Sequence, residues 1–584
     1  MINVRYVAIF VLSLALVGCG SDEGDTNAKV DLSSTQLRYV PDDSPYVFAM
    51  LEPLPSPILE RFSGMFDEVF VAYKDVLLTA VEEGRRERQG QDVENDPEYE
   101  KQQELLNYFA QKMFSEEGLK SIGFGTDSTF VLFGHGLLPV LRIQLTDGEL
   151  MRNFIAEAQE EAEKEMPTAV IDGQAYWHTP DTEKAQGFMA VIGDELVLTF
   201  APSEASDDTL KALLGLSAPE RNASDNNEFA KMLSDYGYVA HGVSGVIDFT
   251  KIADVFLGEP TGINAELVQL MDFDNSNISD ICKAEIREMI DVMPRMVTGY
   301  TKFTPDEMVS DFVIEIREDL ATSLTELAAP VPGVGTSKTG MFSFGMGFDI
   351  PKSIEFAKAQ IAAVEADPYE CEYFADMQSG LDQMKAALAQ PIPPFVSGVK
   401  GFNFIVDEIE MDDQMQPDPN SIKMRGLIAV DNAPAMWGMA TMFSPELAQL
   451  GVEPNQKAVE VDTATIPGFD GSAFVGMGEN SIALSVGLDD ANLDDIFNAN
   501  VKSEPPVISM AYDLDAYLDF VMHFSRLDAL KNKDLDPEEA AAEEAALELV
   551  DKVMSALDGV FGWTSVDMVF TEKGFKLEQL VQMK

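Results

Sequence analysis

Cysteine and histidine are scarce in this chain of 584 residues, with three and four copies. Three cysteines and four histidines are too few for the usual structural zinc sites, and no H-E-x-x-H spacing occurs. No C-x-x-C pair is present, which argues against a redox enzyme. No G-x-S-x-G nucleophile elbow is present either. We therefore interpret the four histidines as surface or core residues: His135, His178, His241 and His523.

Basic residues are also few, because 40 lysines and arginines face 101 aspartates and glutamates, for a net charge of −61. A surface this acidic repels phosphates, so we expect no nucleic-acid partner. The hydrophobic share of 46% nevertheless excludes a disordered chain. At roughly 150 residues per domain, the length allows two to four domains.

Two segments resemble ligand loops but depart from the patterns that bind. Gly333–Thr339 has Ser337 where a phosphate loop requires glycine before Lys338. Asp272–Asn277 begins like a calcium loop, but Asn277 replaces its sixth-position glycine, and the bidentate glutamate is missing. A looser cation site in this oxygen-rich loop is the alternative. We predict no catalytic residue, no metal site and no cofactor.

A stripe of methionines lies at helical spacing between residues 433 and 445. Met436, Met439 and Met442 accompany Trp437 in this stripe. Thioethers can bind copper(I), but a methionine stripe is more often adaptable core. We expect core packing here.

The first residues have the pattern of an export signal. Arg5 precedes the apolar run Val7–Val17, which is too short for a stop-transfer helix. The run ends in Leu16, Val17, Gly18 and Cys19, which resembles the lipobox of bacterial lipoproteins.

That resemblance implies cleavage before Cys19, with Leu16, Val17 and Gly18 read by the signal peptidase. It also implies acylation of Cys19 by fatty acids such as palmitate. Several acyl chains anchor a protein firmly, whereas one binds only marginally. An aspartate directly after the cysteine would signal inner-membrane retention, and Gly20 stands there, which implies the outer membrane. An ordinary signal peptide with a chance cysteine is the alternative.

The polar segment after Cys19 contains no apolar period. We interpret 1–18 as signal peptide and 19–37 as a lipidated flexible tether. The charged stretch Arg85–Gln103 is expected to be a solvated insertion.

The rest of the chain repeats one pattern six times. Each instance is a strand-like run that ends in an acidic residue and is followed by a helical pattern. An acidic residue at this place suits an N-cap of the next helix. The six acidic residues are Glu52, Asp147, Asp248, Asp349, Asp431 and Asp513.

The first three instances pair in order with the last three, and the sequence separation of the pairs decreases steadily along the chain. Two further pairs fit between them, the turn segments at Gly193 and Gly478 and the strand openings at Gly299 and Gly562. We therefore predict two related halves from an internal duplication. The halves span 38–328 and 338–584, and the Pro- and Gly-rich segment 329–337 is predicted to link them.

Hairpin patterns alternate with helical patterns in both halves. The predicted hairpins cover Gly173–Phe200, Val297–Ile316 and Thr564–Gln582. A well-signed helix start is expected at Asp536. This alternation favours an α+β fold with mostly antiparallel sheet and interleaved helices.

The opening of the first half carries a weak resemblance. Pro41-Asp42-Asp43-Ser44 is similar to the Pro-x-Asp-Ser/Thr opening of certain bacterial envelope proteins of unknown function. That resemblance implies a fold analogy and no chemistry.

Two cysteines remain besides Cys19. Each of Cys282 and Cys371 opens a helical pattern, on opposite sides of the proposed linker. An exported protein meets an oxidising compartment, so we expect either a disulfide between them or two buried thiols.

Three functions remain open. The first is a lipid-anchored envelope lipoprotein that acts as a non-enzymatic binding or scaffolding module, with its body in the periplasm or on the cell surface and an unknown protein partner. The second is a periplasmic carrier of an apolar ligand or lipid, for which the 29 methionines and 36 phenylalanines are suited. The third is a carboxylate-based hydrolase acting on envelope glycans, which would need two carboxylates in one cleft.

Overall fold

A computed structural model provides the structure of the chain. It describes residues 35–62, 108–163 without 110 and 114, 165–180, 184–336, 338–410, 420–463, 471–488, 493–517 and 560–584, together with 65, 71 and 418. The residues of the proposed signal and lipid site, Leu16, Val17, Gly18 and Cys19, lie outside these ranges. So do Arg85–Gln103 and the helix start expected at Asp536.

The fold is α+β, and nineteen strands occur in the described ranges. The chain separates into two compact units. The described residues of unit 1 come from 35–277, 295–310 and 560, and those of unit 2 from 278–294, 311–517 and 561–584. None of the described helices is long and apolar enough to cross a membrane.

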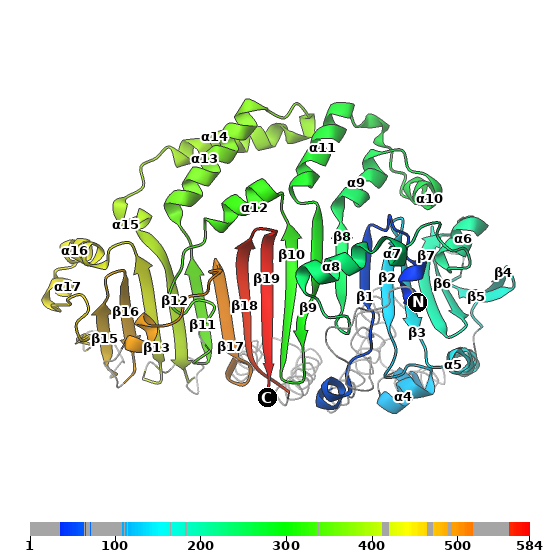
Figure 1. Cartoon of the computed structure of the whole chain (residues 1–584), viewed down its shortest axis with the longest axis horizontal. Helices are drawn as coiled ribbons and strands as arrows, with labels where there is room; N and C mark the ends of the chain where they lie inside the picture. Colours follow the sequence, from blue (N-terminus) through cyan, green and yellow to red (C-terminus); the bar gives the residue numbers. More distant parts are fainter. Residues whose placement is uncertain are drawn as a thin grey trace, which may run out of the picture. The chain divides into compact units, whose positions relative to one another are not determined.

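Unit 1 contains an antiparallel sheet in the order β4–β5–β6–β7–β3–β2–β1–β8–β9 (Figure 1). Its strands are β1 (Tyr46–Met50), β2 (Phe130–His135), β3 (Leu138–Gln144), β4 (Thr168–Ile171), β5 (Gln174–His178), β6 (Ala185–Ile192), β7 (Glu195–Pro202), β8 (Ser244–Asp248) and β9 (Arg295–Phe303). Its helices are η2 (Gln36–Tyr39), α4 (Glu116–Ser121), α5 (Gly148–Glu161), α6 (Asp207–Leu213), α7 (Ala223–Asn226), α8 (Glu228–Tyr236), α9 (Phe249–Leu257), α10 (Gly262–Leu270) and η3 (Asn275–Asn277).

Unit 2 contains an antiparallel sheet in the order β14–β15–β16–β13–β12–β11–β17–β18–β19–β10. Its strands are β11 (Phe342–Gly347), β12 (Val399–Glu408), β13 (Lys423–Val430), β14 (Val459–Glu460), β15 (Ala473–Met477), β16 (Ser481–Val486), β17 (Ile508–Asp513), β18 (Phe561–Thr571) and β19 (Gly574–Met583). The chain passes from unit 1 to unit 2 within β10 (Glu307–Glu315).

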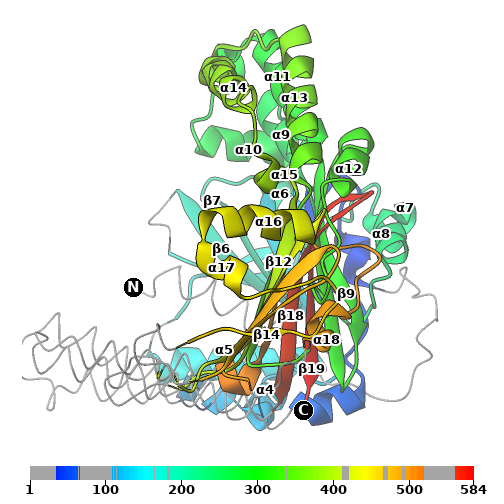
Figure 2. The ribbon, with the colours of Figure 1, turned by 90° about the vertical axis from the view of Figure 1, so that its left-hand side faces the viewer.

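The helices of unit 2 begin with α11, which precedes β9 in the chain. They are α11 (Asp280–Val292), α12 (Glu318–Thr325), α13 (Ile350–Ala366), η4 (Glu372–Phe374), α14 (Ala375–Leu388), α15 (Pro394–Ser397), α16 (Ala433–Phe443), α17 (Pro445–Gln449) and α18 (Asp494–Phe497). Helix α12 packs on β18 and β19, and Figure 2 shows α12 and α18 on the same side of these strands.

The predicted hairpins form. Strands β5, β6 and β7 cover Gly173–Phe200, and β18 and β19 close at Thr571 and Gly574 as expected. Gly574 adopts φ +140°, and an added Cβ there would lie 2.2 Å from the carbonyl oxygen of Ile314, so glycine is required at this turn.

The segment 329–337 does not separate the compact units, since both of its neighbours belong to unit 2. Val331 and Val334 are buried in one core cluster with Leu427, Ala429, Ala483, Leu493 and Ile496. The prolines and glycines that indicated a linker instead form turns that place these two valines on the sheet.

Candidate binding surface

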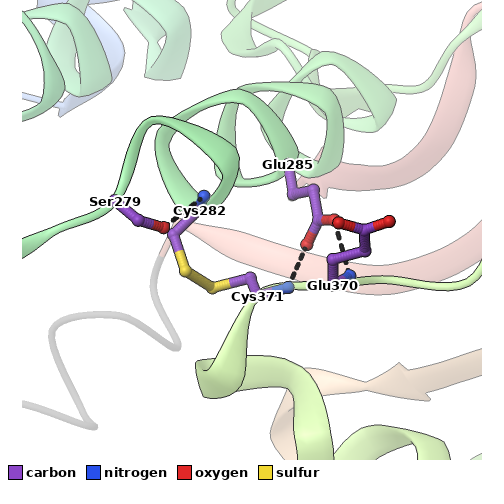
Figure 3. Close-up of a disulfide and its surroundings, with 5 residues drawn as sticks. All are labelled: Ser279, Cys282, Glu285, Glu370 and Cys371. Carbon is purple, nitrogen blue, oxygen red and sulfur yellow. Dashed lines mark hydrogen bonds between the residues drawn. A yellow bond between two sulfur atoms is a disulfide. The ribbon is translucent and has the colours of Figure 1, made fainter.

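The structure joins Cys282 and Cys371 by a disulfide bond, with 4.7 Å between the two Cα atoms (Figure 3). Both residues belong to unit 2, so the bond lies within that unit. Both cysteines are almost completely buried. A bond so enclosed is shielded from attacking thiolates, which indicates a structural role.

The neighbourhood of the disulfide fixes helix α11 in unit 2. The Ser279 hydroxyl accepts a hydrogen bond from the Cys282 amide and caps the helix. One turn further, the Glu285 carboxylate accepts hydrogen bonds from the amides of Glu370 and Cys371, at 2.7 and 3.0 Å (Figure 3). A covalent bond and two charge-assisted hydrogen bonds therefore attach α11 to the segment before α14.

Most of the acidic residues at strand ends serve as helix caps. Asp147, Asp248 and Asp349 accept amide hydrogen bonds at the starts of α5, α9 and α13. Asp513 accepts one from the Ala516 amide. These carboxylates are engaged with the backbone, as the capping interpretation predicts.

Two of the six do not cap. The cap of α16 is Asn432, one residue later than expected, and Asp431 instead forms an ion pair with Lys400. The Glu52 amide donates to the carbonyl of Ala240 at a bend of the chain.

The calcium-like loop is occupied by its own interactions. Asp272 forms an ion pair with Lys184, and a carboxylate oxygen of Asp274 accepts a hydrogen bond from the Ser276 amide. No group of three histidine, cysteine, aspartate or glutamate residues that could hold a metal ion occurs within the described ranges.

The Pro41–Ser44 opening has a structural role in unit 1. The buried Ser44 hydroxyl donates to the carbonyl of Gly134, and Lys251 donates to the carbonyls of Asp42 and Ser44. These bonds fix the turn that precedes β1.

A buried arginine is the strongest polar feature of unit 1. The guanidinium of Arg142 on β3 pairs with the Glu195 carboxylate, donates to the Leu214 carbonyl at 3.0 Å and lies 3.6 Å from the centre of the Tyr39 ring. Arg38 forms a second ion pair with Glu195. This cluster fixes η2 on the sheet, since its charges are paired and hydrogen-bonded as burial requires.

A small polar cavity of about 140 Å³ adjoins this cluster. The amide nitrogen of the buried Gln36 side chain, one of its lining residues, has no hydrogen-bond partner. Small-molecule sites usually measure roughly 300–1,000 Å³, so this cavity suits a few waters better than an organic ligand. Its one carboxylate, Glu195, is already paired, so the cavity lacks the second carboxylate of a glycan hydrolase.

The two faces of the unit 2 sheet differ in the size of their side chains. Cross-strand partners share a face, and successive residues alternate between faces. One face, which we call the inner face, carries small and polar residues across neighbouring strands. They include Ser343, Gly345, Asn403, Ala429, Ala483 and Ser509.

Small residues on the inner face allow the segment 329–337 to approach the sheet. An added Cβ at Gly345 would lie 2.5 Å from a methyl of Val334, and one at Gly401 would lie 2.8 Å from a methyl of Val331. The Asn403 side chain donates to the Pro332 carbonyl. The inner face is therefore buried.

The opposite face, which we call the apolar face, carries large hydrophobic side chains in continuous rows. One row joins Leu484, Phe404, Phe344, Met510 and Val566 through cross-strand partners. The next row joins Ile482, Ile428, Phe402, Met346, Ile508 and Met568.

These rows remain accessible. Ile428, Leu484 and Met510 are 49%, 42% and 40% exposed, and their neighbours in the two rows are only half-buried. Large contiguous apolar patches are unusual on soluble proteins and mark binding surfaces. The apolar face is our candidate binding surface.

The corresponding strands of unit 1 are covered instead. Leu141, Leu196 and Val191 on β3, β7 and β6 are buried in a cluster with residues of α4 and α5, among them Ile122 and Met151. The two sheets therefore differ in what lies over their large side chains.

The methionine stripe of α16 is only partly core. Met436 and Trp437 pack against a cluster that includes Val430 and Val475. Met442, however, is 81% exposed, so the expectation of core packing is wrong at that end of the helix. The helix ends before its last turn can reach the core.

A network of charged residues lies on the inner face of β10, β19 and β18. Lys502 pairs with Asp567 and Glu578, and Lys576 pairs with Glu578. Burial raises the pKa of Asp311 to about 6, against the opposing effect of Lys576. The paired charges satisfy the burial requirement and leave no cleft open to a substrate.

Sequence reasoning did not identify the apolar face, although a signal was present. Strand β11 reads Phe-Ser-Phe-Gly-Met-Gly, in which large apolar residues alternate with small ones. Such alternation indicates one close-packed face and one accessible apolar face.

Comparisons with protein-family models, curated proteins and solved structures found no match.

Proposed function

We propose that this chain is a lipid-anchored, non-enzymatic envelope protein that binds an elongated apolar ligand, such as a lipid acyl chain, on the apolar face of unit 2. The observation that carries the proposal is the accessibility of two continuous rows of large hydrophobic side chains. Leaving such rows in water costs roughly 25 cal/mol for each Å² of apolar surface. A ligand that covers them recovers this free energy.

The rows suit a long and flexible ligand. They cross six strands from β16 to β18, which at 4.7–4.9 Å per strand spacing is about 24 Å. Each methylene that such a ligand buries contributes about 0.8 kcal/mol. Met346, Met510 and Met568 are among the lining residues, and methionine side chains adapt to ligands of varied shape.

The lipobox-like residues 16–19 support the anchor. Under the proposal, acylated Cys19 holds the protein at the outer membrane, and the polar segment that follows tethers the body in the periplasm or on the cell surface. A Cys19→Ala variant should lose labelling by radioactive palmitate and leave the membrane fraction. Retention of the label on that variant would contradict the anchor.

We further propose that the two halves, 38–328 and 338–584, derive from one ancestral unit by duplication. Unit 1 has the order β6–β7–β3–β2–β1–β8–β9, and unit 2 has β15–β16–β13–β12–β11–β17–β18, with each strand in the corresponding place along the chain. The strands paired by their sequence patterns, β1 with β11, β3 with β13 and β8 with β17, occupy equivalent places in the two orders. This correspondence supports the proposal.

The burial of short hydrophobic segments also supports duplication. Leu37 and Val40 precede β1 and are buried, as Val331 and Val334 precede β11. An experimental structure in which the two units have different strand orders would contradict duplication.

Ligand binding is tested with the nonionic fluorescent probe N-phenyl-1-naphthylamine. The protein is the chain from residue 19 onward with Cys19→Ser, which cannot be acylated. We expect saturable binding of the probe and its displacement by a long-chain fatty alcohol. The variant Ile428→Ser/Leu484→Ser/Met510→Ser should bind the probe at least tenfold more weakly.

The control variant is Val170→Ser, which changes a side chain of unit 1 that is 67% exposed. It should bind like the parent protein. Equal probe binding by the triple variant and the parent would overturn the proposed function.

A further inference from the structure

The end of α16 exposes two neighbouring large hydrophobic side chains. Phe443 and Met442 are 86% and 81% exposed, more than any other large hydrophobic residue in the part of the chain that the structure describes. They lie in the last turn of α16, directly before α17, at the end of the unit 2 strands (Figure 1).

The base of this helix is held firmly. Met436 and Trp437 pack against a core cluster that contains Val430, Val475 and Met477. Asn432 caps the first turn by accepting a hydrogen bond from the Ala435 amide. The exposed residues are thus presented by a supported helix.

The segment also lacks charge. About a quarter of the chain is charged, yet no charged residue occurs between Asp431 and Glu446. In a chain with a net charge of −61, this uncharged end is suited to an apolar, uncharged environment and not to a basic protein partner.

The size of the exposed feature argues in the same direction. Two side chains expose a few hundred Å² at most, whereas a stable protein interface needs roughly 800 Å² from each partner. A lipid bilayer requires no matching shape, because it accommodates apolar side chains one by one at its interface.

We propose that Met442 and Phe443 insert into the interfacial region of a zwitterionic lipid bilayer. The same end is then the point at which an acyl chain passes from the bilayer to the apolar face. Ile482 lies in that face and also packs against the cluster that holds Met436 and Trp437, so the hydrophobic surface continues from the helix to the sheet. The passage of an acyl chain rests on the proposed function, whereas the insertion does not.

The test measures sedimentation with vesicles, using the chain from residue 19 with Cys19→Ser. We expect binding to phosphatidylcholine vesicles, and weaker binding when phosphatidylglycerol is added, because the acidic surface is repelled by anionic lipid. The variant Met442→Ser/Phe443→Ser should lose at least tenfold in the partition coefficient. The control Val170→Ser should partition like the parent protein.

Each further outcome decides between the two proposals. A parent protein that binds N-phenyl-1-naphthylamine but not vesicles overturns the insertion and leaves the proposed function standing. A parent that binds vesicles through Phe443 but not the probe supports the insertion and overturns the proposed function. If the Met442→Ser/Phe443→Ser variant sediments with vesicles like the parent, or if this pair proves to mediate self-association in analytical ultracentrifugation, the insertion is overturned.

Discussion

Phe344 on β11 lies directly opposite Met510 on β17, with both side chains on the apolar face of the unit 2 sheet. Met510 is 40% exposed. The next residue of β11, Gly345, points to the other face and meets Val334. Two adjacent residues thus separate a close-packed face from an accessible one, and the predictions below depend on this difference.

The adjacent residues Leu427 and Ile428 on β13 should respond differently to the same substitution. Leu427 is 1% exposed in the core of unit 2, so Leu427→Ser should destabilise the protein by about 3–5 kcal/mol. Ile428 is 49% exposed, and Ile428→Ser should cost less than about 1 kcal/mol. Urea unfolding of the two variants measures both values, and equal losses would show that the apolar face is covered.

Two glycine substitutions test the close approach on the inner face. Gly401 adopts φ +149°, and an added Cβ would lie 1.9 Å from the Met346 carbonyl oxygen. Gly401→Ala should therefore cost more than about 2 kcal/mol. Gly438 lies inside α16 with nothing within 4 Å of the added Cβ, so Gly438→Ala should stabilise by about 0.5–1 kcal/mol. Thermal unfolding gives both signs, and a harmless Gly401→Ala would refute the proposed contact.

Loss of the disulfide should destabilise unit 2. The bond closes a loop with a sequence separation of 89, for which removal costs about 2–5 kcal/mol. Cys282→Ser, Cys371→Ser and the double variant should lose the same amount, because each removes the same bond. Urea unfolding measures the loss. Additive losses from the two single variants would show that the cysteines are not bonded to each other.

The carboxyl group of Asp311 should make stability depend on pH. Burial raises its pKa to about 6 in the folded protein, from a value of 3.8 when exposed. The folded state therefore binds the proton more tightly, so this contribution is fully present below pH 3.8 and is lost as the pH rises through about 6. A shift of about two pKa units corresponds to about 3 kcal/mol.

An Asp311→Asn variant cannot ionise and should not lose this contribution. Its free energy of unfolding, relative to that of the parent, should rise by about 2–3 kcal/mol between pH 4 and pH 7.5. A pH-independent difference between the two proteins would contradict the burial argument.

Local features of the fold could be predicted from the sequence because they depend on neighbouring residues. Asp147, Asp248 and Asp349 cap the helices that follow them, since a carboxylate placed before a helix can reach its first amides. The hairpin of β18 and β19 closes at Gly574 because that turn requires a residue with positive φ.

Features that depend on distant residues could not be predicted. The segment 329–337 has the composition of a linker, and only the small residues Gly345 and Gly401 on other parts of the chain make it core. Helix α11 precedes β9 in sequence, yet Cys371 and the amide of Glu370 hold it in unit 2. Neither relationship has a signal within its own segment.

The candidate surface lies between these cases. The alternation of Phe, Met and Ile with Ser, Gly and Asn in β11, β12 and β17 is visible in the sequence, but which face is covered depends on where 329–337 folds. The methionine stripe was predicted as core because helical spacing does not show where a helix ends relative to its sheet. Met442 is exposed for that reason.

The most direct test of the apolar face is photo-crosslinking with a diazirine-labelled long-chain fatty alcohol, followed by peptide mass spectrometry. The account predicts that adducts concentrate on the peptides of β11, β12, β13, β16 and β17 that carry Phe344, Phe404, Ile428, Leu484 and Met510, and that unlabelled fatty alcohol suppresses them. Adducts spread evenly over the chain, or confined to unit 1, would contradict it.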